Sequence, residues 1–314
     1  MRGTGYLFVA TGSILWATNG IVSSLVLDAG RVSPSDLAAF RTYASALLLG
    51  AGVVAVLPGL SRSSLVRLAA FGIFGVSLPQ WLFYESISRI DVPIALVIVY
   101  TAPVLVTAFE RVVRRQRLPG AVYLAIVVAI GGVVAAVLGN ADGLGALSGL
   151  GLLLAVATMA AYSCQILLAA IQPAELRPLQ RIGGAMVFSC LFWLVLDPAW
   201  TLPFHVLDDP IGLGPRVAGM APTGLLIVYI TVLGTVVPYG LLVAGAPRIG
   251  AGAASVTGMA EPIVASVLAW LFLGQSLTGV QIIGIGVALA GVTVAETLRA
   301  RARSRLNVEG VFAS

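Results

Sequence analysis

The stretch from Gly72 to Ile90, GIFGVSLPQWLFYESISRI, returns in outline 159 residues later, from Thr231 to Ile249, as TVLGTVVPYGLLVAGAPRI. The correspondence continues without a gap to residues 133 and 292. The matched positions are mostly residues that shape a backbone: Gly75/Gly234, Pro79/Pro238, Arg89/Arg248, Pro103/Pro262, Gly120/Gly279 and Gly132/Gly291. An internal repeat of this kind indicates two structurally related halves.

The composition restricts the class of protein. Hydrophobic residues make up 59% of the 314 residues and charged residues only 10%, whereas soluble domains have about a quarter charged. The chain is therefore expected to be an integral membrane protein. All 18 basic residues are Arg, which excludes a Walker lysine and a lysine Schiff base. With one His, two Cys and no catalytic constellation, we expect neither an enzyme, nor a metal site, nor a cofactor.

Runs of about 20 apolar residues, separated by breaks, predict ten transmembrane helices. Their approximate bounds are residues 5–26, 34–57, 65–88, 92–113, 120–138, 147–171, 178–200, 222–246, 250–273 and 277–298. The predicted fold is an all-α membrane protein with two five-helix repeats, 1–146 and 147–298, and an Arg-rich tail at 299–314. Because five is odd, we expect inverted repeats around a central cavity, the architecture of secondary transporters.

The distribution of arginine predicts the orientation. Fourteen of the 18 arginines lie at the amino terminus, in the loops that follow helices 2, 4, 6 and 8, or in the tail. The positive-inside rule then places both termini in the cytoplasm. These arginines flank apolar spans and form no patch with interleaved aromatic residues, so we expect contact with the lipid bilayer and none with nucleic acid.

Four prolines that the repeat pairs lie inside predicted helices. Each removes a backbone donor and collides with the carbonyl four residues earlier, and in three cases that residue is glycine. We expect hinges at these positions: Gly75, Pro79, Gly234, Pro238, Pro103, Gly258 and Pro262. Static kinks in packed helices are the alternative.

Helices 5 and 10 carry small residues instead, at Gly131-Gly132 and at Gly284, Gly286, Ala288 and Gly291. Small faces favour close helix contact. We expect the two helices to pack within one chain rather than to form a dimer interface, and either a monomer or a homodimer fits this pattern.

Glu261 lies near the centre of predicted helix 9, where a charged side chain costs at least about 2.5 kcal/mol without water or a partner. We expect it to bind a substrate ammonium or to carry a proton; a hydrogen-bonded structural acid is the alternative. Aromatic residues and amides cluster in the other central helices, and the amides of Asn19, Gln80 and Gln165 would be costly facing lipid. The predicted substrate site comprises Trp16, Asn19, Gln80, Tyr84, Tyr100, Tyr162, Gln165, Tyr239 and Glu261.

Two further charged residues, Arg41 and Glu85, fall in the outer half of the membrane. We expect a structural or gating salt bridge between them. Since Arg41 is then the only deep basic residue, the cavity does not suit phosphorylated substrates, which need convergent cations. Aromatic walls, amides and one carboxylate suit a small amphipathic or zwitterionic solute.

The sequence resembles the drug/metabolite transporter superfamily, EamA type, over nearly its whole length. The residues that carry the resemblance are Ser13 to Asn19, Ala102-Pro103, Glu261-Pro262-Ile263, Leu273-Gly274-Gln275 and Gln281 to Val292. Gln275 stands where the family often has an acid. The aromatic residues of helices 3 and 4 are most similar to YddG-type aromatic amino acid exporters. The resemblance implies a bacterial inner membrane location, and a cavity lined by helices 1, 3, 4, 6, 8 and 9.

The leading hypothesis is therefore a secondary transporter that exports small amphipathic metabolites by alternating access, with amino acids, including aromatic ones, as the expected substrates. An exporter of drugs or other cationic compounds on the same scaffold is the first alternative. A channel or a membrane ligand sensor is the alternative from a different class, against which the paired prolines argue.

Overall fold

The computed structural model describes residues 2–113, 115, 119–139, 148–169, 171–173, 175–249 and 251–312. The predicted boundary between the repeats, at residues 146 and 147, lies outside this part. The first half contains α1 (Arg2–Asp28), α2 (Pro34–Ser45), η1 (Ala46–Gly50), η2 (Leu57–Gly59), α3 (Arg62–Ala70), η3 (Phe71–Ser77), α4 (Leu78–Ile87), α5 (Val92–Val99), α6 (Ala102–Val112) and α7 (Gly120–Leu138).

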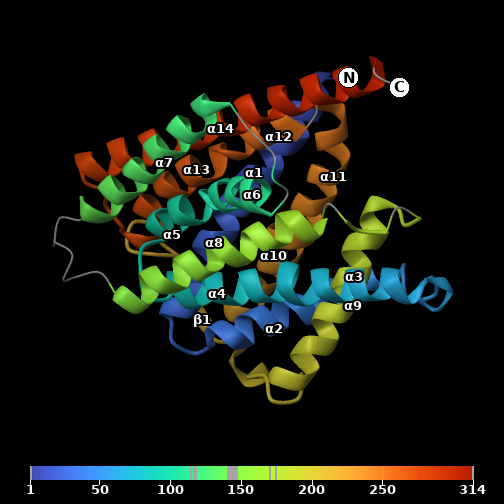
Figure 1. Cartoon of the computed structure of the whole chain (residues 1–314). Coiled ribbons are helices and arrows are strands. Elements are labelled where there is room, and N and C mark those ends of the chain that lie inside the picture. Colours follow the sequence, from blue (N-terminus) through green and yellow to red (C-terminus); the bar gives the residue numbers. More distant parts are fainter. Residues whose placement is uncertain are drawn as a thin grey trace.

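The second half contains α8 (Gly149–Ala169), α9 (Pro178–Leu196), η5 (Phe204–Val206), β1 (Pro210–Gly212), β2 (Met220–Pro222), α10 (Thr223–Thr231), η6 (Val232–Val236), α11 (Val237–Ile249), α12 (Ala251–Gly258), α13 (Ala260–Leu268), η7 (Ala269–Leu273) and α14 (Gly279–Phe312). Helix α14 thus continues through most of the predicted tail. The start of α1 and the end of α14 lie at the same end of the molecule (Figure 1).

Eight helices in the described part are long and apolar enough to cross a membrane: Gly3–Asp28, Arg62–Ile87, Val92–Phe109, Gly120–Leu138, Gly149–Ala169, Pro178–Leu196, Thr223–Ile249 and Gly279–Arg301. The other two predicted spans are interrupted. In residues 34–57, α2 gives way to the π-helical η1 and then to turns, and residues 251–273 are divided after Gly258. The protein is therefore a multi-pass helical membrane protein, and the count of ten remains a prediction.

The four paired prolines lie beside irregular backbone. The π-helical segments η3 and η6 end just before Pro79 and Pro238. A helix is broken between α5 and α6 just before Pro103, and again between α12 and α13 before Pro262. Wider π turns and breaks re-satisfy the backbone groups that proline leaves free, so each expected kink takes one of these two forms.

The three glycines grouped with these prolines differ in their surroundings. A Cβ at Gly75 would press on the Phe71 ring, and one at Gly234 would collide with the Asn19 side chain. A Cβ at Gly258 would meet nothing within 4 Å. Close packing therefore requires glycine at the first two positions, whereas Gly258 lies beside open space.

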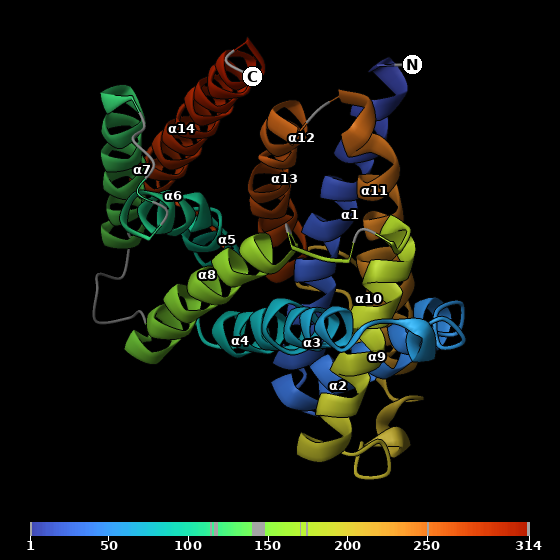
Figure 2. The same cartoon turned by 45° about the vertical axis from the view of Figure 1, so that its right-hand side comes forward.

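Helices α7 and α14 lie side by side at one edge of the molecule (Figures 1 and 2). Cβ atoms added to Gly132, Gly284 and Gly291 would collide with the facing backbone. Glycine lets the two backbones approach closely, as small residues do between membrane helices. The expectation that these small faces pack within one chain is confirmed.

Helix α1 runs through the middle of the other helices, in contact with α10, α11, α12 and α13 (Figure 2). The long segment between α9 and α10 has structure of its own, because β1 pairs antiparallel with β2. Arg31 forms an ion pair with Asp209 of this segment, at 2.9 Å. Its hairpin is therefore tied to the turn that follows α1.

The α7–α14 contact can be tested with neighbouring glycines. Gly132→Ala places a methyl group against the backbone of Ala288, and overpacking of this kind costs about 1–3 kcal/mol of unfolding free energy. Gly131→Ala is the matched control, since its Cβ would meet nothing within 4 Å. We expect a lower midpoint of thermal unfolding in detergent for Gly132→Ala only. Equal midpoints for the two variants would contradict the observed contact.

Candidate functional site

A cavity of about 270 Å³ lies among the central helices. Its polar or charged lining comes from α1, α2, α4, the α5–α6 break, α8, α11 and α13, and consists of Trp16, Asn19, Arg41, Gln80, Tyr100, Thr158, Tyr162, Gln165, Tyr239 and Glu261. The structure thus brings eight of the nine predicted substrate-site residues together and adds Arg41. The resemblance implied a cavity lined by predicted helices 1, 3, 4, 6, 8 and 9, which correspond to α1, α4, α5–α6, α8, α11 and α13, and all of these line the cavity. Helix α2 lines it in addition.

The two helix breaks meet at this cavity. Tyr100 lies between α5 and α6, and Glu261 lies in the first turn of α13. The Tyr100 hydroxyl donates a hydrogen bond of 2.6 Å to Glu261 Oε2. Non-helical backbone at membrane depth is tolerated where it lines a cavity, and here each break carries a polar side chain into that cavity.

One wall of the cavity is aromatic. The rings of Trp16 and Tyr239 meet edge to face, with centroids 5.5 Å apart, and the Gln165 amide donates to the Tyr239 hydroxyl at 3.3 Å. This wall joins α1, α8 and α11. Its ring faces and edges can contact an apolar or aromatic group of a ligand.

Asn19 lies deep beside the same wall. The side chain is 5% exposed, and its Oδ1 atom is buried without a hydrogen-bond partner in the described part of the chain. It packs against Gly234 of η6. An unpartnered buried acceptor is costly, and Asn19 keeps this oxygen against Gly234 while the residue lines the cavity.

Arg41 lines the cavity from α2 and does not form the predicted salt bridge with Glu85. The residue is 6% exposed, and its Nε donates to the Thr235 hydroxyl, which in turn donates to the Ile230 carbonyl at 3.0 Å. Arg41 Nη1 is buried and has no partner among the described residues. The predicted Arg41–Glu85 pair is therefore wrong.

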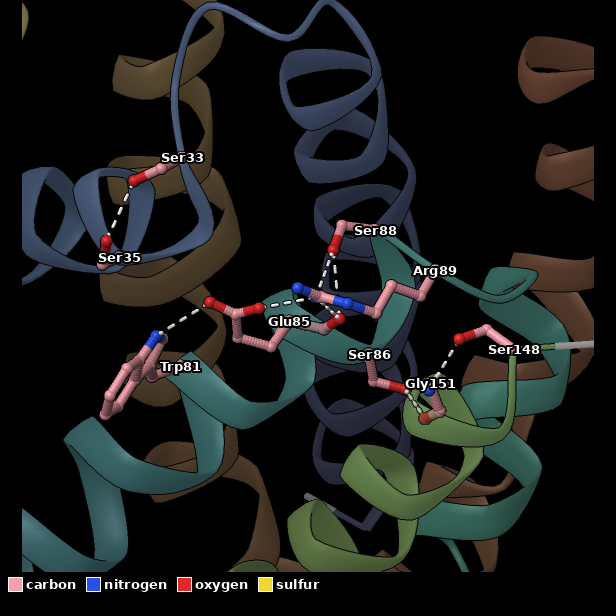
Figure 3. A network of polar contacts seen from close by, with 9 residues as sticks. All are labelled: Ser33, Ser35, Trp81, Glu85, Ser86, Ser88, Arg89, Ser148 and Gly151. Atoms are coloured by element: carbon pink, nitrogen blue, oxygen red, sulfur yellow. Dashed lines mark hydrogen bonds and ion pairs between the residues drawn. The ribbon is translucent and has the colours of Figure 1, made fainter.

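Glu85 belongs to a separate network near the end of α4 (Figure 3). One carboxylate oxygen accepts from the Trp81 indole at 3.3 Å, and the other pairs with Arg89, one turn later. The pair forms locally because side chains four residues apart share a helix face. The Ser33–Ser35 hydrogen bond is visible nearby.

Tyr84 does not line the cavity. It has no exposed surface, belongs to the hydrophobic core, and its hydroxyl has no partner within the described residues. Trp193, although it lies near the end of α9, is also buried, at 1% exposed, against Trp81. In α4 the polar residues Gln80, Glu85 and Ser86 are spread around the helix, so the sequence does not show which face turns inward.

Several apolar residues of the cavity were not predicted from the sequence. They lie three or four residues from predicted ones, which is the spacing of one helix face: Val76 and Phe83 beside Gln80, Leu96 beside Tyr100, Ile166 and Ala169 beside Tyr162 and Gln165, and Leu242 beside Tyr239. Helical spacing from Gln80 and Tyr162 was the signal that could have identified them.

A larger groove of about 800 Å³ lies between α13, η7 and α14, but none of its lining residues is charged. Its walls are mostly exposed apolar side chains such as Ile263, Val267 and Ile282. Its polar lining is limited to the hydroxyls of Ser266, Ser276 and Thr293 and the Trp270 indole, without a charged group that could bind an ionic ligand. The smaller cavity is therefore the candidate functional site.

The sequence profile of the EamA-like transporter family matches residues 3–138 and 149–297. The chain belongs to this family. The EamA-type chain is similar to the uncharacterized inner membrane transporter YicL of Salmonella typhimurium, with 26% identity over 96% of this chain and 97% of that protein. It is also similar to the uncharacterized transporter YwfM of Bacillus subtilis, with 25% identity over 94% of each chain.

A crystal structure shares the fold of this EamA-family transporter. It matches 96% of this chain and 99% of its own chain, with a TM-score of 0.60 at 18% identity. At that identity the match speaks for the arrangement of helices alone. The family and the fold therefore define a membrane transporter, whose cavity chemistry has to be inferred from its own residues.

Two Tyr→Phe variants separate the cavity from the core. Tyr100→Phe removes the hydroxyl that donates to Glu261, and we expect a loss of about 1–3 kcal/mol of unfolding free energy because a buried carboxylate loses its partner. Tyr84→Phe is the matched control: its hydroxyl has no partner in the described structure, so stability should be unchanged or higher. Thermal unfolding in detergent measures both, and a larger loss for Tyr84→Phe would contradict this placement.

Proposed function

We propose that this protein is a secondary transporter that exports amino acids, including aromatic ones, by alternating access. The observation that carries the proposal is the Tyr100–Glu261 pair, which sits at the two helix breaks inside a cavity with an aromatic wall. A carboxylate recognises an ammonium group, and aromatic rings accept an apolar or aromatic side chain.

The size of the cavity supports a small cargo. Its volume of about 270 Å³ is near the lower end of ligand pockets, which range over about 300–1,000 Å³. A single amino acid is of this order of size, whereas a folded peptide or a large multi-ring compound is not.

The arrangement of irregular backbone supports alternating access by two inverted five-helix repeats. The segments η3 and η6, and the two helix breaks, fall at positions that the 159-residue offset pairs. In transporters with inverted repeats, broken helices at the repeat interface surround the substrate and the repeats move against each other. We assign the hinges to these four places, in a ten-helix scaffold.

The proposed location is the bacterial inner membrane, with both termini in the cytoplasm. The excess of arginine in alternate loops and in the tail supports this orientation. The start of α1 and the end of α14 lie at the same end of the molecule, as this orientation requires (Figure 1). The relative YicL is described as an inner membrane transporter.

Cationic compounds are the second candidate cargo, because Glu261 lies among aromatic residues that also attract a cation. Arg41 in the same cavity opposes a ligand with positive charge alone. A transport assay must therefore include both kinds of compound.

The transport proposal predicts flux of amino acids across proteoliposomes that contain the purified protein. With a mixed panel of labelled amino acids, we expect uptake of aromatic members well above protein-free liposomes, and competition by unlabelled tryptophan. A quaternary amine should compete poorly. If no member of the panel moves while the quaternary amine does, the amino acid assignment is wrong and the cation exporter replaces it.

Energy coupling gives a separate prediction for Glu261. If its carboxylate carries the coupling proton, Glu261→Gln should abolish accumulation driven by a pH gradient. Exchange at saturating substrate should persist, because the amide oxygen still accepts a hydrogen bond from an ammonium group. Glu85→Gln, outside the cavity, is the control and should retain both activities. Unchanged accumulation by Glu261→Gln would refute the coupling role of Glu261.

A further inference from the structure

Arg41 carries a charge that the protein leaves unsatisfied. Guanidinium stays protonated throughout the physiological pH range, yet this side chain is 6% exposed and its Nη1 has no hydrogen-bond partner among the described residues. No carboxylate of the described chain lies within ion-pair distance of it. A buried charge without a partner is strongly unfavourable, so the site is complete only when an anionic group enters.

Hydrogen bonds hold the Arg41 side chain in position. Its Nε donates to Thr235, whose hydroxyl is fixed by the Ile230 carbonyl. Thr235 and the cavity residue Tyr239 are four residues apart and so lie on one helix face. The hydrogen bond at Nε therefore anchors one edge of the guanidinium, while Arg41 lines the cavity and its Nη1 has no partner among the described residues.

The cavity contains two charged residues among its lining, Arg41 and Glu261. They come from α2 and α13 and do not pair with each other. A ligand with one ammonium and one carboxylate carries an opposite charge for each of them. A ligand with an ammonium alone leaves Arg41 unpaired, and a phosphate dianion meets a single guanidinium and is repelled by Glu261.

We propose that Arg41 is the carboxylate-binding residue of this transporter and that, with Glu261 as the ammonium-binding residue, it selects zwitterionic amino acids over their decarboxylated amines. This inference rests on the proposed function and names its substrate class. The guanidinium donates paired N–H bonds to the substrate carboxylate, the geometry in which arginine binds carboxylates most strongly. The aromatic wall of Trp16 and Tyr239 then contacts the substrate side chain.

Three related probes separate the two charged groups of the substrate. Tryptophan has both, tryptamine has the ammonium alone, and indole-3-propionate has the carboxylate alone. We expect the wild-type protein in detergent to bind tryptophan most tightly by isothermal titration calorimetry. Each single-charge probe should bind roughly ten- to hundredfold more weakly, the value of a hydrogen bond to a charged group.

Each variant should lose affinity only for the probes that carry the charge its residue binds. Arg41→Gln is expected to weaken the binding of tryptophan and indole-3-propionate roughly ten- to hundredfold. The affinity for tryptamine should stay the same or increase. Glu261→Gln should weaken tryptophan and tryptamine and spare indole-3-propionate. Arg89→Gln removes an arginine that pairs with Glu85 outside the cavity, and this control should leave all three affinities unchanged.

Thr235→Val provides a second test if Arg41→Gln does not fold. It keeps the charge of Arg41 and removes the hydrogen bond at Nε. We therefore expect weaker binding of tryptophan and indole-3-propionate, by a smaller factor than that by which Glu261→Gln weakens the binding of tryptamine. A monodisperse gel-filtration profile and an unfolding midpoint near that of the wild type show that each variant is folded.

Two results would overturn the assignment of Arg41 while the transport proposal survives. One is equal weakening of all three probes by Arg41→Gln, which indicates a structural role. The other is unchanged binding of tryptophan and indole-3-propionate. If the wild-type protein binds none of the three probes and moves no amino acid in proteoliposomes, the proposed function fails, and the assignment of Arg41 fails with it.

Discussion

The structure depends on one constraint, the need of every backbone polar group in a bilayer for a hydrogen-bond partner. Regular helix meets this need wherever the chain contacts lipid. Proline breaks it at four paired positions, and the chain responds with the π-helical segments η3 and η6 or with an open break. Since irregular backbone is stable only inside the protein or beside water, the same prolines determine where the cavity lies.

The second determinant is the cost of charge in the same medium. Most charged residues of the described chain lie near helix ends or in loops, where water or a local partner is close, as Glu85 and Arg89 illustrate. Arg41 and Glu261 are the exceptions, and both line the cavity. Packing alone gives no reason to keep an isolated cation and a carboxylate in one apolar core, whereas recognition of a polar ligand does.

Much of the site could be predicted from the sequence because its signals are chemical. Amides and an acid inside apolar spans are too costly to face lipid, and aromatic residues cluster with them; eight of the nine residues chosen from this group line the cavity. Tyr84 and the Arg41–Glu85 pair failed for a geometric reason. Both depend on the rotation of a helix about its axis, and α2 and α4 carry polar residues on more than one face, so their sequences give no clear signal of that rotation.

The Tyr100–Glu261 hydrogen bond has a consequence for the empty transporter. Its two partners belong to the two halves of the chain that the 159-residue offset relates, so this bond has to open in the proposed cycle, in which the halves move against each other. Opening a bond to a charged group without a replacement costs about 1.5–3 kcal/mol, which slows a step by roughly ten- to a hundredfold. In the same proposed cycle a substrate ammonium replaces the Tyr100 hydroxyl as the partner of the carboxylate. The loaded protein would then reorient faster than the empty one, and exchange would be faster than net release.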